Sequence, residues 1–544
     1  MLGVQQILQE VTSLEGRRFI VVSNRQPFAH VRRGEVVRVE KPPSGLTLAL
    51  EPIVQATRGT WIAASSGNAD GERVDAAGRV EPQPGMGYRL RRIFLPPKLQ
   101  QDFYTGFANS TLWPLCHIAY HQPRFEERWW KAYLQANQIF ADTVADEVDG
   151  EPAVIFVQDF HLAMLPALLR ERCPNAVIAQ FWHIPWPNPE AFRICPWRKE
   201  LLRGLLGNDL LGFHLPYHCN NFMETVDREL QVRVDRESNA VVGTHSRTSV
   251  AAFPMSVDYQ RIQQAARQPE AQAEAMQLRH LYTHGQAAGC QNNGSTRKLV
   301  ISVERLDYSK GILERLEAIQ RLFERHPQWR GKVEFVHIAT PSRTTVRAYR
   351  DYAQAVDRTV ARVNAAHGTP EWTPIRALHI YVEPEKVWNW YQAADAVIVS
   401  SLHDGMNLVS KEFVAAGRED AVLLLSEFTG AARALREAVL INPYATDSFA
   451  DAIAHALAMP EAERRDRMRR LRWRVAHYDI GVWAREILRA IQQREFDVQD
   501  PRLSLADAPA RGGGGGRRRG DAQPGGEPRL AEAAAPRLAR ARRH

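Results

Sequence analysis

Short runs of aliphatic and β-branched residues recur along the first half of the chain, and each ends in polar or ionisable residues. Residues 18–23 form one such run, and residues 152–159 and 176–183 form two more. Continuous apolar runs of this length predict strands that are buried on both faces. Residues 162–172 separate the last two runs and favour a helix, so the pattern predicts parallel strands joined by a crossover helix.

A second series of the same kind follows residues 284–294, a break rich in Gly, Gln and Asn. Each apolar run in it is expected to be a strand followed by a helix. We therefore predict an α/β fold with two Rossmann-like, doubly wound domains that face each other across a cleft, where ligands bind beyond the carboxyl ends of the strands. The strands expected in the second series are residues 298–303, 333–339, 378–382, 396–400 and 421–426.

The same pattern divides the chain of 544 residues into five segments. The expected segments are an N-terminal extension (1–17), a first domain (18–255), a second domain (256–480), a C-terminal helix that crosses back to the first domain (481–500) and a tail (501–544).

Charge is distributed unevenly between the body of the chain and its tail. Residues 501–544 hold ten arginines against four acidic residues, a net charge of +6 out of the +8 of the whole chain. The tail also contains five consecutive glycines at 512–516 and no apolar periodicity, so we expect it to be disordered. A nucleic-acid-binding function would rest on this tail alone.

Cysteine usage and hydropathy bear on the compartment. The five cysteines are an odd set without a Cys-x-x-Cys pair, which argues against both a disulfide framework and a structural zinc site. No window approaches about 18 continuous apolar residues, so neither a signal peptide nor a membrane span is indicated. We expect a cytoplasmic protein.

Two motifs in the second half carry candidate chemistry for a diphosphate. Arg305 and Lys310 lie in a loop after a predicted strand, and Gly311 permits close backbone approach. Two cations at a strand exit suit a diphosphate, although a surface loop with ordinary ion pairs has the same pattern. Residues 401–412 run from a strand through a turn into a helix, whose free N–H groups would face an anion.

Carboxylates flank this second motif. Asp404 stands at the strand exit and Glu412 about two turns into the helix, positions from which a carboxylate could bind sugar or ribose hydroxyls. The alternative for Glu412 is that it only complements the helix dipole.

In the first half, polar residues again follow the predicted strands. Asp159 and His183 end two strands and could orient a substrate hydroxyl, while Arg25 would suit a second anion. Tyr104 and Trp113 could stack on sugar faces, although core packing is the default for either ring. A buried histidine with satisfied hydrogen bonds is the commoner explanation for His183 taken alone.

Taken together, these motifs resemble the trehalose-6-phosphate synthase family, retaining glycosyltransferases of GT-B fold. The resemblance covers roughly residues 18–495, and nothing after it resembles the phosphatase domain that often follows in the family. The motifs are Ser23-Asn-Arg25, Leu112-Trp-Pro114, Gln158-Asp-Phe-His161, Trp182-His-Ile-Pro185, Asp209-Leu-Leu-Gly-Phe213, Ser302-Val-Glu-Arg-Leu-Asp-Tyr-Ser-Lys310, Pro341-Ser-Arg343 and Asp404-Gly-Met-Asn-Leu-Val-Ser-Lys-Glu412.

The resemblance implies transfer of glucose from a nucleotide sugar, usually UDP-glucose, to glucose 6-phosphate, without metal or other cofactor. Asp159, His183, Arg305, Lys310 and Asp404 are implied to be the catalytic residues. The donor site is implied to comprise Gly45, His183, Arg305, Lys310, Asp404, Gly405, Met406, Asn407, Leu408, Val409 and Glu412. The acceptor site is implied to comprise Arg25, Tyr104, Trp113, Asp159 and Arg343, with both arginines on the acceptor phosphate.

The expected partners are these two small substrates, with no membrane and no specific nucleic acid. A homo-oligomer is left open. Two positions depart from the family pattern. Ser44 stands before Gly45 where a Gly-Gly pair is usual, and His403 replaces the usual Arg before Asp404.

Two other activities compete with this interpretation. A sister enzyme such as glucosylglycerol-phosphate synthase would share most of the donor site but use glycerol 3-phosphate, whereas Arg343 and the Ser309-Lys310 pair favour the trehalose type. A catalytically silent regulatory homologue would need a lost donor or acceptor residue, and each of the matched charged positions is present.

Overall fold

The computed structural model of the chain describes residues 16–41, 45–83, 85–243, 247–284 and 297–499. The chain divides into a unit of residues Met1–Phe496 and a short unit of residues Asp497–His544. The predicted tail at 501–544 lies outside the described residues, as does almost all of the predicted N-terminal extension.

A mixed sheet occupies the first half of the described chain. Its central strands are parallel, and short antiparallel hairpins complete both edges. The parallel strands are buried along almost their whole length, which agrees with their continuous apolar runs. In spatial order the ten strands found among the described residues are β10 (Arg233–Asp235), β11 (Ala240–Val242), β12 (Arg247–Ala252), β9 (Leu210–Phe213), β8 (Val177–Phe181), β7 (Ala153–Gln158), β1 (Arg18–Arg25), β4 (Thr60–Ala64), β6 (Arg89–Ile93) and β5 (Arg79–Val80).

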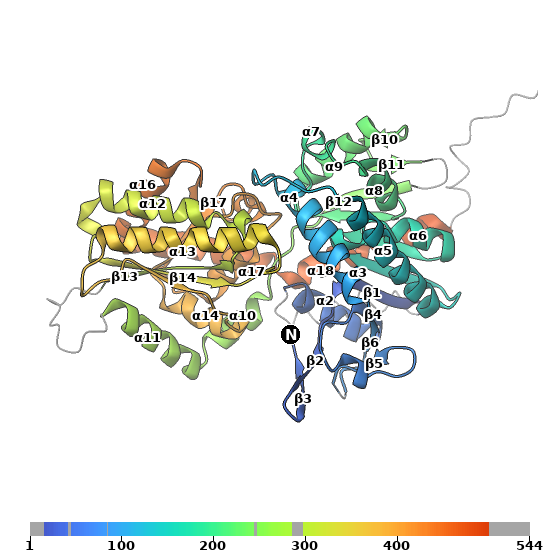
Figure 1. Ribbon diagram of the computed structural model, residues 1–544, viewed down its shortest axis with the longest axis horizontal. Helices are drawn as coiled ribbons and strands as arrows, with labels where there is room; N and C mark the ends of the chain where they lie inside the picture. Colours follow the sequence, from blue (N-terminus) through green and yellow to red (C-terminus); the bar gives the residue numbers. More distant parts are fainter. Residues whose placement is uncertain (1–15, 42–44, 84, 244–246, 285–296, 500–544) are drawn as a thin grey trace, which may run out of the picture. The chain divides into compact units, whose positions relative to one another are not determined.

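A fully parallel sheet occupies the second half, with helices on both faces (Figure 1). Helices α12 (Ile312–Arg325) and α13 (Arg347–His367) lie on one face, and α10 (Tyr259–Ala266) and α14 (Pro384–Ala393) on the other. Along the central strands of this sheet, successive residues are buried alternately in two hydrophobic clusters, one on each face, because successive side chains point to opposite faces. In spatial order the strands are β15 (Ile375–Leu378), β14 (Val333–Thr340), β13 (Lys298–Arg305), β16 (Ala396–Val399), β17 (Val422–Ser426) and β18 (Val439–Ile441).

The predicted α/β fold with two Rossmann-like domains is therefore confirmed, while two details of the prediction are wrong. The strand expected at 378–382 is β15, Ile375–Leu378, because pairing with β14 stops at Leu378. Ile380 and Tyr381 are about half exposed in the loop beyond, so their strand-like composition comes from a loop and not from the sheet. The strand expected at 421–426 is β17, and it is followed by a short 3₁₀ turn and then by strand β18, where a helix was expected.

The last described helix, α18 (Ile480–Gln499), packs on the first sheet. Its Trp483, Ile487 and Ile491 are buried in one cluster with Phe19 of β1 and Phe156 of β7. These contacts bring the last described helix and the first described strand into one hydrophobic core.

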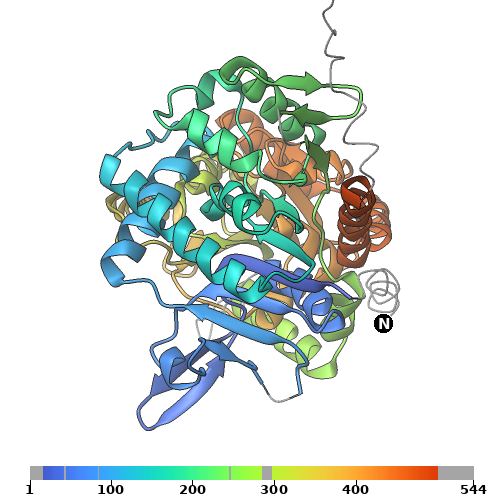
Figure 2. The ribbon, with the colours of Figure 1, turned by 90° about the vertical axis from the view of Figure 1, so that its right-hand side faces the viewer.

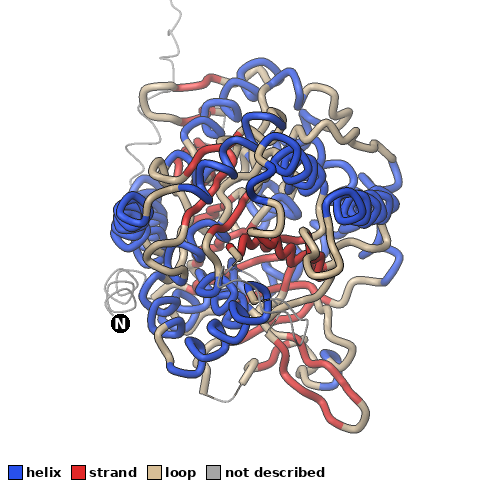
Figure 3. The backbone as a smooth tube through the Cα atoms, turned by 90° about the vertical axis from the view of Figure 1, so that its left-hand side faces the viewer, coloured by secondary structure: helices blue, strands red, loops and turns tan. Residues whose placement is uncertain are grey.

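A two-stranded hairpin, β2 (Ala29–Arg33) and β3 (Val36–Glu40), extends from the first half of the chain (Figures 2 and 3). Among the described residues its two strands pair with each other and form a separate two-stranded sheet. Within the part of the chain that the structure describes, no helix combines the length and apolarity required to cross a membrane.

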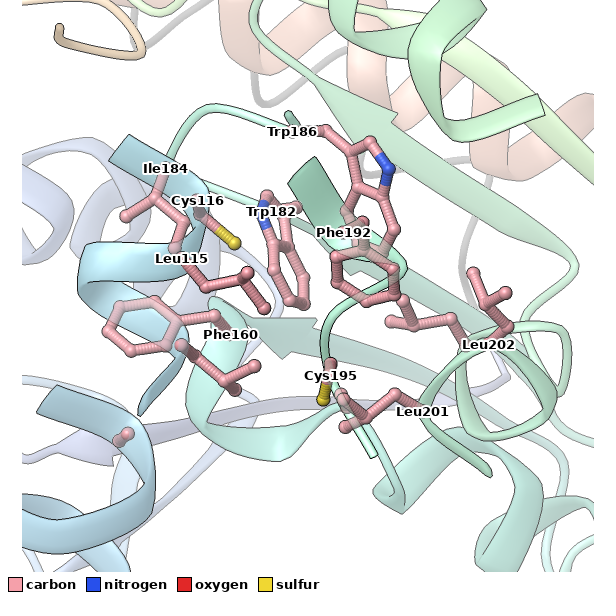
Figure 4. Packing of buried hydrophobic residues seen from close by; sticks show 14 of the residues in the cluster. Leu115, Cys116, Phe160, Trp182, Ile184, Trp186, Phe192, Cys195, Leu201 and Leu202 are labelled. Carbon is pink, nitrogen blue, oxygen red and sulfur yellow. The ribbon is translucent and has the colours of Figure 1, made fainter. Parts of the chain in front are cut away.

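An aromatic cluster supports the ends of strands β7 and β8 (Figure 4). Trp182 and Trp186 are almost fully buried and pack edge to face, with Phe192 against Trp186 and Phe160 against Trp182. The proline-rich run after β8 is thus fixed by ring packing, and it holds His183 at the end of the strand.

Candidate active site

A cavity of about 410 Å³ lies at the carboxyl ends of the parallel strands of both sheets. Arg25 ends β1, Asp159 follows β7 and Arg305 ends β13, and all three line it. This is the edge at which open α/β sheets bind ligands, because strand ends and helix N-termini converge there. The first-half and second-half candidates therefore face the same space.

Nearly all site residues predicted from the sequence line this cavity. Among those whose surroundings the structure describes, Gly405 is the exception. Gly405 packs behind the cavity, where an added Cβ would meet the carbonyl oxygen of His183 at 2.7 Å. Gly45 begins helix α2 (Gly45–Ala56), directly after undescribed residues, so its role stays a prediction. The predicted residues that line the cavity are Arg25, Tyr104, Trp113, Asp159, His183, Arg305, Lys310, Arg343, Asp404, Met406, Asn407, Leu408, Val409 and Glu412.

The Lys310 ammonium donates a hydrogen bond to Oδ2 of Asp404 at 2.6 Å. Burial would raise the pKa of Asp404, but Lys310 outweighs it and holds this pKa well below the ordinary value of a carboxyl. The carboxylate is ionised at neutral pH and can accept hydrogen bonds from sugar hydroxyls beside the Lys310 cation.

The loop that carries Lys310 is held against the end of β16 by close backbone approach. Gly311 has a φ of +63°, and a Cβ there would lie 2.0 Å from the carbonyl oxygen of Ser400. The Ser400 hydroxyl donates to the carbonyl oxygens of Lys310 and Gly311. Only glycine fits this position, which confirms the close approach that the sequence predicted for Gly311.

Helix α15 (Leu408–Ala416) begins at the cavity. Asn407 is its N-cap, with a φ of +83°, and its side chain accepts a hydrogen bond from the N–H of Ser410 at 2.9 Å. Leu408 and Val409 line the cavity in the first turn, where backbone N–H groups lack partners within the helix. The helix start therefore supplies an anion site beside Arg305 and Lys310.

Glu412 lies one turn further along α15, between this cavity and a second one of about 420 Å³. Burial raises the pKa of Glu412 to about 7. The second cavity also shares Arg305 and is walled by Val382, Trp388 and other apolar side chains. A ligand that spans both would place its charged part at Lys310 and a flat or apolar part beyond Glu412.

On the opposite wall, Arg25 donates a hydrogen bond to the Tyr104 hydroxyl at 2.9 Å. The guanidinium of Arg343 lies 4.1 Å from the centre of the Trp113 ring, and that of Arg305 lies 5.0 Å from it. Burial would raise the pKa of Tyr104, but Arg25 and Arg343 outweigh it and lower this pKa to about 8. This wall is a concentrated positive site suited to a phosphate.

Asp159 and His183 meet at the ends of their strands as predicted. The backbone N–H of His183 donates to Oδ1 of Asp159 at 3.3 Å, and its ring Nε2 lies 3.1 Å from Oε1 of Gln158. Burial raises the pKa of Asp159 to about 6 and lowers that of His183 to about 3. His183 is therefore neutral at physiological pH and serves as a hydrogen-bonding group.

Several side chains at or behind the cavity were not among the predicted site residues, and four of them bear on its chemistry. His117 lines it, and His161 lines it while stacking on Tyr104. Asp307 and Tyr349 lie behind the arginines. His161 and Asp307 stand within recognised motifs, so their proximity to other site residues was a usable signal. His117 and Tyr349 carry no such signal in the sequence.

The two departures from the family pattern have different outcomes. Ser44 lies outside the described residues. The Nδ1 of His403 lies 2.8 Å from the carbonyl oxygen of His117 at the end of helix α4 (Trp113–His117). Burial lowers the pKa of His403, so at neutral pH this position lacks the positive charge of an arginine.

Two further observations concern metals and cysteines. Across the described ranges, no three His, Cys, Asp or Glu side chains gather in a way that could hold a metal ion. The four cysteines within those ranges, Cys116, Cys173, Cys195 and Cys219, are free and buried.

Comparison with known proteins gives a family match over most of the chain. A family model described as glycosyltransferase family 20 matches residues 17–493. The chain belongs to glycosyltransferase family 20. It is therefore a glycosyltransferase, and the resemblance to the trehalose-6-phosphate synthase family is confirmed.

Relatives in this family agree with the match. The chain is 36% identical over 497 residues to a trehalose-6-phosphate synthase of Mycolicibacterium vanbaalenii, covering 88% of this chain and 97% of that protein. Among solved structures, it is similar to an α,α-trehalose-phosphate synthase (UDP-forming) of Burkholderia vietnamiensis, with 31% identity, a TM-score of 0.77 and coverage of 89% and 98%. It is also similar to the enzyme of Burkholderia xenovorans in complex with glucose-6-phosphate, with 29% identity, a TM-score of 0.76 and coverage of 87% and 100%.

Proposed function

We propose that this glycosyltransferase moves glucose from UDP-glucose to glucose 6-phosphate, with retention of the anomeric configuration, and releases trehalose 6-phosphate and UDP. One observation carries the proposal: a single cavity joins the Lys310 and α15 anion site to a second anion site at Arg25 and Arg343. Transfer between a sugar diphosphate and a sugar phosphate needs two such sites within a sugar's length of each other.

The donor half of the site supports a nucleoside diphosphate sugar. Arg305, Lys310 and the first turn of α15 would bind the diphosphate and stabilise the charge that develops on it as the sugar leaves. Glu412 would accept hydrogen bonds from the ribose diol at the entrance to the second cavity. The UDP-forming name of the Burkholderia vietnamiensis relative favours uracil as the base.

The acceptor half supports a sugar phosphate. Arg25 and Arg343 would bind the phosphate, with Tyr104 and Trp113 against the sugar. Asp159 would accept hydrogen bonds from the acceptor's hydroxyls, and His183 would bind the primary hydroxyl of the donor glucose. The crystal structure of the Burkholderia xenovorans relative in complex with glucose-6-phosphate favours this acceptor.

Retention would follow from front-face substitution. In this scheme the acceptor hydroxyl attacks from the side on which the diphosphate departs, and a departing phosphate oxygen takes the acceptor proton. No protein carboxylate is then needed as a nucleophile. We propose that the reaction needs no metal, because two cations and a helix start already face the diphosphate site.

Product analysis with purified full-length protein tests the proposal. UDP-, ADP- and GDP-glucose would each be incubated with glucose 6-phosphate or glycerol 3-phosphate, with and without EDTA. We expect a disaccharide phosphate from UDP-glucose and glucose 6-phosphate, equally with EDTA, and an α,α linkage by NMR.

The other outcomes separate the alternatives. Product only with glycerol 3-phosphate would establish the sister activity. Absence of product from every pairing would contradict the proposal and favour a silent homologue. Activity abolished by EDTA and restored by a divalent cation would remove the metal-independent part alone.

A further inference from the structure

We infer that Asp307 is a positioning residue that sets the geometry of the donor and acceptor anion sites together. Its carboxylate does not line the cavity and is fully buried. It contacts Arg305 on the donor side and Arg343 on the acceptor side, and it fixes the turn that carries Lys310. The inference rests on the proposed function, because it concerns the same two sites.

One oxygen of Asp307 shapes the Lys310 turn. Asp307 is the N-cap of a 3₁₀ turn, Tyr308–Lys310. Its Oδ1 accepts hydrogen bonds from the N–H of Ser309 at 3.0 Å and from the Ser309 hydroxyl at 2.9 Å. The carbonyl oxygen of Asp307 accepts the N–H of Lys310 at 3.0 Å. A capping carboxylate of this kind holds the backbone that directs Lys310 into the cavity.

The other oxygen holds the two arginines. Oδ2 accepts a hydrogen bond from Nη1 of Arg343 at 3.1 Å and lies 3.7 Å from Nη2 of Arg305. The Tyr349 hydroxyl contacts the same Arg343 nitrogen and lies 3.4 Å from Oδ2. Arg343 itself has a φ of +49°, so its backbone conformation is unfavourable for a side-chain-bearing residue and needs such support.

Charge explains why a carboxylate is needed there. Arg305 and Arg343 both lie against the Trp113 ring, so their like charges repel each other. Burial would raise the pKa of Asp307, but the two arginines and Lys310 outweigh it and keep this pKa below its ordinary value. The ionised carboxylate reduces the repulsion and holds both guanidinium groups in the cavity wall.

Removal of the charge has two opposite expected effects, which makes the inference testable. A carboxylate that only offset positive charge would weaken anion binding, and Asp307→Asn would then bind both anions more tightly. A carboxylate that positions the cations would leave them misplaced when it is neutralised, and both anions would then bind more weakly.

The experiment measures UDP and glucose 6-phosphate binding separately by calorimetry, on full-length wild type and on Asp307→Asn. We expect both dissociation constants to rise by about tenfold or more, the loss that one charge-assisted contact causes. Unchanged or tighter binding of either ligand to Asp307→Asn would overturn the inference. A wild type that binds neither ligand would instead contradict the proposed function.

Asp395→Asn is the matched control. Asp395 is a buried carboxylate held by Arg279, Lys298 and Arg418 at the start of β16, away from the cavity. Its neutralisation is expected to lower the unfolding temperature without changing either dissociation constant. Equal weakening of ligand binding in Asp395→Asn would mean that loss of any buried charge suffices, and would overturn the positioning role.

Tyr349→Phe keeps the inference testable if Asp307→Asn does not fold. It removes only the hydroxyl that bridges Arg343 and Asp307. The dissociation constant of glucose 6-phosphate is expected to rise about threefold to tenfold, with that of UDP unchanged. No change for glucose 6-phosphate would count against the inference.

Discussion

The donor and acceptor sides of the cavity are built differently. Apart from His183, the donor side comes from two short runs of the chain, residues 305–310 and 404–412, each following a strand of the second sheet. The acceptor side combines Arg25, Tyr104 and Asp159 from three distant segments of the first half with Arg343 from the second half. The donor site is thus defined by local turns, while the acceptor site depends on long-range packing.

This difference has an energetic consequence. In the local turn from Asp307 to Gly311, hydrogen bonds between neighbouring residues hold the cation Lys310 in place. Tyr104 lies in a π-helix, Gln101–Leu112, that packs against helix α5 (Glu127–Val148), and it contacts Arg25, 79 residues earlier in the chain. We expect substitutions on the donor side to act mainly on the chemical step, and substitutions on the acceptor side mainly on acceptor binding.

The largest expected effect is that of Lys310→Ala. It removes a cation from the diphosphate site and leaves Asp404 buried without its partner at 2.6 Å. We expect kcat to fall on the order of 10²–10³-fold, as for loss of one preorganised electrostatic donor. UDP release measures it, and Lys332→Ala, at an exposed lysine, is the control. Near wild-type turnover of Lys310→Ala would contradict the donor assignment.

Asp159→Asn is expected to act next most strongly, on the acceptor. We expect kcat/KM for glucose 6-phosphate to fall about tenfold to a hundredfold, with the KM of UDP-glucose nearly unchanged, because a charged hydrogen-bond acceptor is lost.

The pH dependence sharpens this test. The pKa of Asp159 is about 6, so its carboxyl becomes protonated as pH falls through 6 and accepts hydrogen bonds poorly. Wild-type kcat/KM for glucose 6-phosphate should therefore fall below pH 6 more steeply than that of Asp159→Asn. Titration of the substrate phosphate is common to both proteins and cancels in the comparison. Parallel profiles would show that Asp159 is not the titrating group.

Tyr104→Phe should have a smaller effect, again on the acceptor alone. The hydroxyl accepts the hydrogen bond of Arg25, and its loss should raise the KM of glucose 6-phosphate severalfold. The pKa of Tyr104 is about 8, so the wild-type phenol ionises as pH rises through 8 and repels the phosphate. Acceptor kcat/KM should decline above pH 8 in wild type and less in the variant. An equal effect on the donor KM would break the separation of the two sides.

Truncation after residue 500 is expected to have the smallest effect. The tail holds most of the net positive charge, but Arg25, Arg305, Lys310 and Arg343, the cations found at the cavity among the described residues, precede it. Sugar transfer by the truncated protein should match wild type at equal concentration. Loss of activity in a truncated protein with an unchanged unfolding temperature would assign the tail a role in catalysis.

The fold class, strands β1, β7 and β8 of the first sheet and strands β13, β14, β16 and β17 of the second could be predicted, because buried parallel strands carry continuous apolar runs. The strand at 375–378 was misplaced because Ile380 and Tyr381 have strand-like composition but lie in a half-exposed loop. The short hairpins at the edges of the first sheet were not predicted, since two- and three-residue strands leave little periodicity in a sequence.

The family motifs identified nearly every predicted side chain that lines the cavity, but they could not show which other side chain each one contacts. That Lys310 contacts Asp404 follows from the adjacency of β13 and β16, which are not consecutive in the chain. That His403 contacts the carbonyl oxygen of His117 depends on two segments 286 residues apart.

By itself, the sequence determined the alternation of strands and helices and the cations that follow strands, because apolar runs and local turns leave their pattern in neighbouring residues. The tertiary structure alone decided that Arg25 meets Tyr104, and that one buried carboxylate, Asp307, joins the cations of two sites. Such contacts depend on strand order and on how helices pack across the sheets, and side-chain identity along the chain does not encode them locally.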